Sequence, residues 1–150
     1  MVRITTPEQE ELERRAVVTE ALTWQNTPYH HMGRVKGAGV DCGMLLAEVF
    51  EQTGLVPHLE VPYYPRDWNL HRKEPVFMKW LEQYAVKVDC EPRPGDIVMF
   101  RYGWNPSHGS IVIEWPVIIH AWINVGVIQA DALKEPLDGK MTGIYSAWGR

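Results

Sequence analysis

The first half of the chain carries apolar positions at the spacing of α-helices. A helix is predicted to begin after Thr6, a typical N-cap residue, and to end near Asn26. A second apolar stripe predicts a helix over residues 42–53, with Asp41 at its N-cap. A third, shorter helix is predicted to start at Pro75. The segments between these helices show no clear period, which is typical of loops.

From Val86 onward the pattern changes to short apolar runs separated by proline and glycine turns, which is typical of β-strands. Strands are predicted at 86–88, 97–102, 108–114, 117–122, 126–130 and 144–148. Helices first and strands afterwards indicate an α+β domain in which a meandering antiparallel sheet packs against the helices. The helix that begins at Cys42 is therefore expected to lie on the sheet.

The composition fits one globular domain over residues 1–150. A chain of 150 residues with 45% hydrophobic and 23% charged content can bury a core by itself. The net charge of −4 argues against a nucleic-acid partner, because such binding depends on clustered lysine and arginine. The polar N-terminus does not resemble a signal peptide, and no apolar run has membrane length. We therefore expect no membrane span and synthesis in the cytoplasm.

The chain has two cysteines, Cys42 and Cys90, which are too few for a disulfide framework. Cys42 stands at the predicted start of a helix. There the positive end of the helix dipole and the unpaired N–H groups favour a thiolate and can steady an oxyanion. Cys90 follows an alternating stretch, and we interpret it as a half-buried residue at the end of a strand. Cys42 is therefore the candidate nucleophile.

Two histidines are candidates to activate the thiol of Cys42. His108 begins an apolar strand and His120 lies in the next one. In an antiparallel hairpin the two rings share a face if His108 lies opposite Trp122 and are separated if it lies opposite Ile123, and we predict the first register. A Cys–His pair with a third polar group holding the imidazole is the general arrangement of an activated thiol. A metal site fits less well, because the sequence contains no CxxC or HxxxH pair.

Four segments around these residues carry a family resemblance. They are TPYHHMGRVKGAGVDCGMLL at 27–46, RPGDIVMFR at 93–101, SHGSIVIE at 107–114 and IIHAW at 118–122. In this combination and order the sequence resembles the NlpC/P60 family, and more closely its phage and gene-transfer-agent branch. The resemblance covers most of the chain and weakens from about residue 55 to residue 85. It departs from the usual pattern at Met44, where many members carry a glycine.

The resemblance implies a papain-like fold and a cysteine endopeptidase that hydrolyses amide bonds in peptidoglycan stem peptides, often beside a D-glutamyl residue. Cys42 matches the family's nucleophile, His108 its base and His120 its third polar member. Tyr29 matches a tyrosine that the family places near the oxyanion, although a packed aromatic residue at the end of the first helix is an equally good interpretation. No cofactor or metal is required.

The resemblance to the phage branch also suggests a tail or baseplate component that is carried to the bacterial envelope. Phage tail proteins are then expected as partners and the virion as the location. The aromatic and proline residues within 56–70 are interpreted either as a docking surface or, more simply, as an ordinary packed loop. Two alternative functions stay open: a structural tail-tip module with an idle site, and an amidase or acyltransferase that uses the same thiol.

Overall fold

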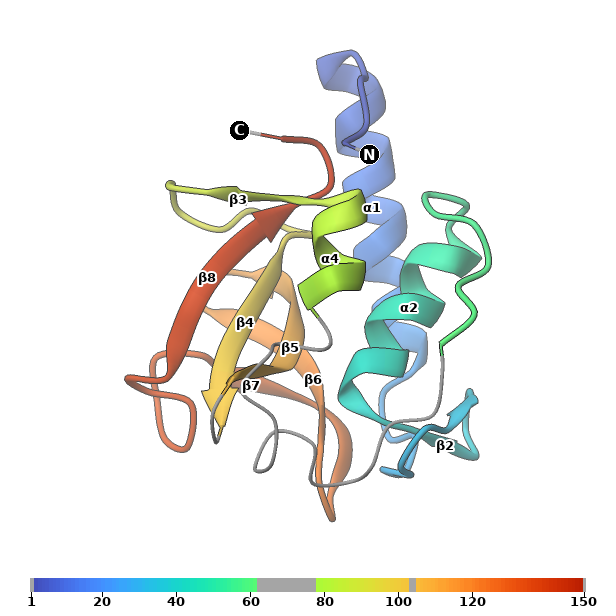
Figure 1. Cartoon of the computed structure of the whole chain (residues 1–150), viewed down its shortest axis with the longest axis vertical. Coiled ribbons are helices and arrows are strands. Elements are labelled where there is room, and N and C mark those ends of the chain that lie inside the picture. Colours follow the sequence, from blue (N-terminus) through green and yellow to red (C-terminus); the bar gives the residue numbers. More distant parts are fainter. Residues whose placement is uncertain (1, 62–77, 103–104, 150) are drawn as a thin grey trace.

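The computed structural model describes residues 2–61, 78–102 and 105–149. In this part of the chain helices cover one face of a six-stranded antiparallel sheet, as Figure 1 shows. The helices are α1 (Pro7–Thr23), α2 (Cys42–Gln52) and α4 (Met78–Tyr84). In sheet order the strands are β3 (Val86–Val88), β8 (Met141–Ser146), β4 (Ile97–Tyr102), β5 (Asn105–Glu114), β6 (Val117–Trp122) and β7 (Gly126–Asp131). The predicted α+β fold, with helices on an antiparallel sheet, is confirmed.

Helix α1 begins as predicted and ends earlier than predicted. The hydroxyl of Thr6 accepts the N–H of Gln9 at 3.1 Å, which caps the first turn. The helix ends at Thr23. Asn26 has a left-handed φ of 73°, and its N–H donates to the carbonyl of Val127 in β7 at 2.9 Å. The predicted end near Asn26 is therefore wrong, because backbone pairing with a distant strand takes over first.

Helix α2 agrees with its prediction to within one residue and lies on the sheet as expected. It ends at Gln52, with Thr53 as its C-cap. Its inner face includes Leu45 and Val49, which are fully buried in the core between helices and sheet. The third helix is described from Met78, and its predicted start at Pro75 lies outside the described residues.

Pairing with neighbours sets the strand ends. Strands β3, β4 and β6 have the predicted bounds, whereas β5 already begins at Asn105 and β7 continues to Asp131. Strand β8 covers Met141–Ser146 instead of 144–148, because it pairs with β4 from Met141 to Tyr145 and with β3 from Ile144 to Ser146. Trp148 has left the sheet, and its indole N–H donates to the carboxylate of Glu13 in α1 at 2.8 Å.

The segment 27–39, predicted to be an irregular loop, contains a small two-stranded sheet of β1 (Arg34–Val35) and β2 (Gly39–Val40). A Cβ atom on Gly39 would lie 2.6 Å from the Cβ of His30, so a glycine is needed for the loop to close on itself. This closed loop leads directly into α2.

A buried ion pair fixes α1 against the turn before β4. The guanidinium of Arg14 donates to the carboxylate of Asp96 at 2.8 Å, and both side chains are about 2% exposed. The same guanidinium donates to the carbonyl of Pro94 and lies 4.4 Å from the ring centre of Trp148. Arg14 therefore ties the first helix to the turn before β4 and to the segment after β8, at one end of the sheet.

Candidate active site

One carboxylate organises the start of α2. One oxygen of Asp41 accepts the N–H of Met44 in the first helical turn at 2.9 Å, as the N-cap prediction requires. Its other oxygen accepts the N–H of Met32 in the preceding loop at 2.8 Å. Cys42 is the first residue of the helix. Asp41 therefore fixes both the start of the helix that carries the thiol and the loop that precedes it.

The sulfur of Cys42 lies against the backbone of β5. Burial, followed by the negative charge of Asp41, raises the pKa of the thiol to about 12, although the N–H groups of Gly109, Gly43 and Cys42 itself lower it. The N–H groups at the helix start favour the thiolate, as expected, but desolvation outweighs them at this site. At neutral pH the resting thiol is protonated. Gly109 follows His108 directly, so the sulfur lies beside the strand segment that carries this histidine.

The two histidines share a face, as predicted. Strands β5 and β6 pair with Ile111 opposite Ile119, which is the register that places His108 opposite Trp122. Nε2 of His108 and Nδ1 of His120 form a hydrogen bond of 2.7 Å. Only 7% of His108 and 2% of His120 are exposed. The structure therefore joins the two imidazoles in one buried pair.

This hydrogen bond assigns roles to the remaining ring nitrogens. If Nδ1 of His108 is to accept a proton from a thiol, its Nε2 must carry a hydrogen and donate it to Nδ1 of His120. His120 then carries its own hydrogen on Nε2, a buried atom for which the described residues supply no hydrogen-bond partner. Such an unsatisfied group costs roughly 1–3 kcal/mol, and a pair of apolar residues would avoid that cost. The arrangement therefore favours a chemical role over a purely structural one.

Both imidazoles are neutral at physiological pH. Burial and the neighbouring charge of His120 lower the pKa of His108 to about 3, and burial lowers the pKa of His120 to about 4. A neutral imidazole has a lone pair with which to take a proton, so His108 rests in the form that a general base requires.

We expect the protein to lose stability as the pH falls from 6.5 to 4.5. An unfolded histidine has a pKa near 6.5, whereas the folded pair ionises only near pH 3 to 4, so the unfolded state binds protons first. Stability that is fully present above pH 6.5 is lost below it, by about 2 kcal/mol for each histidine at pH 4.5. Urea unfolding of the wild type and of His120→Gln at both pH values measures this loss. The variant should lose clearly less, and an equal loss in both proteins would contradict the assignment.

Aromatic residues that sequence reasoning missed surround His108. Its ring centre lies 5.2 Å from Trp122 and 5.8 Å from Tyr102, both edge-on, and 6.1 Å from Phe100. Trp122 also contacts His120, at 5.3 Å. The sequence could have indicated the contact between Trp122 and His108, because the predicted register places these two residues opposite each other. These rings exclude water from the hydrogen bond between the histidines and explain its burial.

Tyr29 lies in the same region as Cys42, and pairing of its backbone accounts for this position. It forms a parallel bridge with Val40, two residues before the cysteine, and its half-buried ring packs on the same core cluster as Cys42. Its assignment to the oxyanion stays a prediction. Cys90 is exposed after β3, so its interpretation as a half-buried strand end is wrong.

A cysteine at the tip of a helix that lies on an antiparallel sheet, with a histidine pair on two adjacent strands, defines a papain-like domain. The family model of the NlpC/P60 family matches residues 26–144. The chain therefore belongs to the NlpC/P60 family. A search of curated proteins finds no significant match.

Solved structures share the fold at low sequence identity. A protein of the NLP/P60 family from Staphylococcus aureus, described as similar to a lipoprotein, has a TM-score of 0.64 and 18% identity over 97% of this chain and 43% of its own. The NlpC/p60 domain of the peptidoglycan hydrolase SagA has a TM-score of 0.61 and 18% identity over 89% of this chain and 97% of its own. RipD from Mycobacterium tuberculosis, described as a non-catalytic domain adapted to peptidoglycan binding, has a TM-score of 0.56 and 14% identity over 89% and 95%. The family fold thus occurs in both hydrolytic and non-catalytic proteins.

The chain spans less than half the length of two of the first three similar structures, at 43% and 39%. Among the described residues, no helix combines the length and the hydropathy needed to cross a bilayer.

Proposed function

We propose that this chain is a cysteine endopeptidase that hydrolyses amide bonds in peptidoglycan stem peptides. Membership in the NlpC/P60 family and the fold shared with the SagA hydrolase domain support the substrate class. The observation that carries the proposal is the 2.7 Å hydrogen bond between His108 and His120, on strands that lie beside the sulfur of Cys42. An imidazole held by a second group next to a helix-tip thiol is what nucleophilic catalysis needs.

In the proposed reaction the sulfur of Cys42 attacks the amide carbonyl while its proton passes to Nδ1 of His108. The N–H of Cys42, with Tyr29 nearby, stabilises the oxyanion that forms. His108 then protonates the leaving amine, and a water molecule that His108 deprotonates releases the acyl group and regenerates the thiol. Because thiol and imidazole are both neutral at rest, the proton moves as the sulfur attacks. His120 accepts the N–H on Nε2 of His108 and stabilises the transient imidazolium.

Digestion of purified peptidoglycan, with the fragments weighed by mass spectrometry, tests the proposal and identifies the bond. The wild type should release stem-peptide fragments, and Cys42→Ala should release none above background, because no other group replaces the nucleophile. Cys90→Ala is the matched control and should cut like the wild type, since Cys90 is exposed after β3. Equal digestion by wild type and Cys42→Ala, or digestion by neither, would sink the proposal.

A second function deserves testing because RipD shares this fold and is described as non-catalytic. In that case the domain would bind peptidoglycan with an idle site. Sedimentation with insoluble peptidoglycan separates the two functions: an idle binder should sediment equally as wild type and as Cys42→Ala, with no soluble fragments from either. The buried histidine pair, which a retired site does not need, favours the enzyme.

We further propose that a phage tail or tail-like particle carries the domain to the cell envelope. This rests on the sequence resemblance around Cys42, His108 and His120. Copurification of the full-length protein with tail or baseplate proteins is the expected result. A particle preparation that contains tail proteins and lacks this chain would contradict it.

A further inference from the structure

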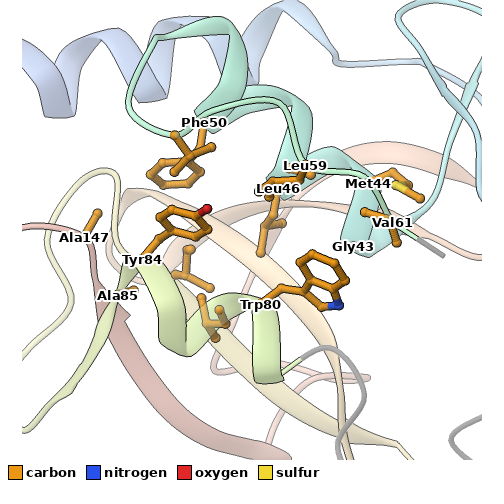
Figure 2. A pocket seen from close by; sticks show the side chains of 14 residues that line it. Gly43, Met44, Leu46, Phe50, Leu59, Val61, Trp80, Tyr84, Ala85 and Ala147 are labelled. Atoms are coloured by element: carbon orange, nitrogen blue, oxygen red, sulfur yellow. The ribbon is translucent and has the colours of Figure 1, made fainter. Parts of the chain in front are cut away.

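An apolar pocket separates α2 from α4, and no part of the proposed reaction uses it. Figure 2 shows it between the two helices, with Phe50 and Tyr84 at one end and Gly43 and Trp80 toward the other. Ile97 of β4 and Ala147 also line it. The space measures about 670 Å³, a volume that includes open solvent at its mouth.

The lining determines what the pocket can hold. Among the described residues, those that line the pocket are apolar or aromatic apart from Gly43, and none of them is charged. A carboxylate or an ammonium group that entered would lose its water and gain no partner, at a cost of several kcal/mol. The D-glutamyl side chain expected beside the scissile bond of a stem peptide does not fit here. The pocket therefore selects a hydrocarbon group.

The pocket reaches the thiol through two residues. Gly43, which lines it, follows Cys42 in the first turn of α2. Leu46, also in the lining, covers Gly109, because a Cβ atom on that glycine would lie 2.8 Å from a methyl group of Leu46. The N–H of Gly109 is in turn one of the groups that contact the sulfur. The pocket therefore begins at the residue after the nucleophile, and Leu46 lies between it and Gly109.

We infer that this pocket is a substrate subsite for a bulky apolar group next to the carbonyl that Cys42 attacks. The inference rests on the proposed reactivity of Cys42 and extends its substrates beyond stem peptides, to compounds that carry an acyl chain or a large apolar side chain beside the scissile bond. Ala47 and Ala85 line the pocket, and their small side chains leave the room that such a group needs.

Labelling with N-alkylmaleimides of increasing chain length tests the subsite without a known substrate. For Cys42 the second-order rate constant should rise about three- to fourfold with each methylene that enters the pocket, between N-methyl- and N-hexylmaleimide. Exposed Cys90 is an internal reference on the same molecule, and its rate constants should stay within about twofold. A chain-length dependence that is the same at both cysteines would overturn the inference.

Ala47→Leu and Ala85→Leu fill the pocket and should abolish the chain-length dependence at Cys42. Ala47 lies in α2 and Ala85 directly follows α4, so two positions on different elements guard against a folding defect in either variant. Ala38→Leu, the same substitution at an exposed site, should retain the wild-type dependence. A dependence that survives both filling variants also overturns the inference.

If Cys42 reacts with no maleimide, the proposed reactivity fails while the pocket can still be tested. In that case 1-hexanol should shift the methyl NMR signal of Met44, which lines the pocket, and leave that of exposed Met141 in place.

If Cys42 does react, hydrolysis of octanoyl against acetyl thioesters, and of phenylalanyl against alanyl amides, distinguishes an acyl chain from a side chain. No shift and no preference in either pair would remove the subsite.

Discussion

Replacement of His108 by alanine should slow alkylation of Cys42 by iodoacetamide more than 100-fold at pH 7. In the wild type the thiol can pass its proton to His108 as it reacts. Without the imidazole only the thiolate reacts, and with a pKa near 12 about one thiol in 10⁵ is ionised at pH 7. The rate of the variant should then rise about tenfold for each pH unit between 7 and 10. Intact-mass and peptide-mapping kinetics measure both effects.

The controls for this experiment lie on the same chain. Alkylation of Cys90 should not change in His108→Ala, which shows that the reagent is active. His120→Ala keeps the proton acceptor and should slow Cys42 by much less. If His108→Ala left the reactivity of Cys42 and its pH dependence as in the wild type, the histidine would have no role as a base, whatever the peptidoglycan assay showed.

Replacement of Arg14 by methionine should lower the free energy of unfolding by about 3–5 kcal/mol. The substitution leaves the carboxylate of Asp96 buried without its cation, because both side chains are about 2% exposed. Burial already raises the pKa of Asp96 even with Arg14 in place, so this carboxylate tolerates no further loss of stabilisation. Urea unfolding at pH 7 measures the difference.

Arg15→Met provides the matched control for this prediction. Arg15 is the next residue of α1, and its side chain is 74% exposed in a 3.4 Å ion pair with Glu11, so its loss should cost less than about 0.5 kcal/mol. Arg14→Met combined with Asp96→Asn should be more stable than Arg14→Met alone, because the buried charge is then gone. Equal destabilisation by Arg14→Met and Arg15→Met would show that the buried pair does not hold α1 to the sheet.

Local patterns predicted the features that depend on local spacing. The parity rule for opposed residues left two kinds of register, and the predicted one, which places His108 and His120 on one face, is observed. The N-cap of α2 was predicted from Asp41 alone. These features are set within a turn of helix or a pair of strands. They do not depend on what packs against them.

The predictions that were wrong concern features that depend on contacts between distant segments. The end of α1 is set by a hydrogen bond from Asn26 to β7, and the shift of the last strand by its two neighbours in the sheet. Burial has the largest effect on the pKa of Cys42, and the residues at the start of the helix do not by themselves predict that burial. The pocket between α2 and α4 needs two helices that are far apart in sequence. Sequence patterns therefore predicted the face that the two histidines share but not the electrostatics around Cys42.

The carboxylate of Asp41, which caps α2, should also affect how fast oxidants react with the sulfur of Cys42. Asp41 holds both the helix and the loop, and its charge helps to keep the neighbouring thiol protonated. Peroxide attacks thiolates and spares thiols, so this sulfur should withstand an oxidising medium for longer than an ionised one. Because Asp41 disfavours the thiolate, Cys42 is protected from oxidation until a substrate carbonyl and the imidazole of His108 are both in contact with it.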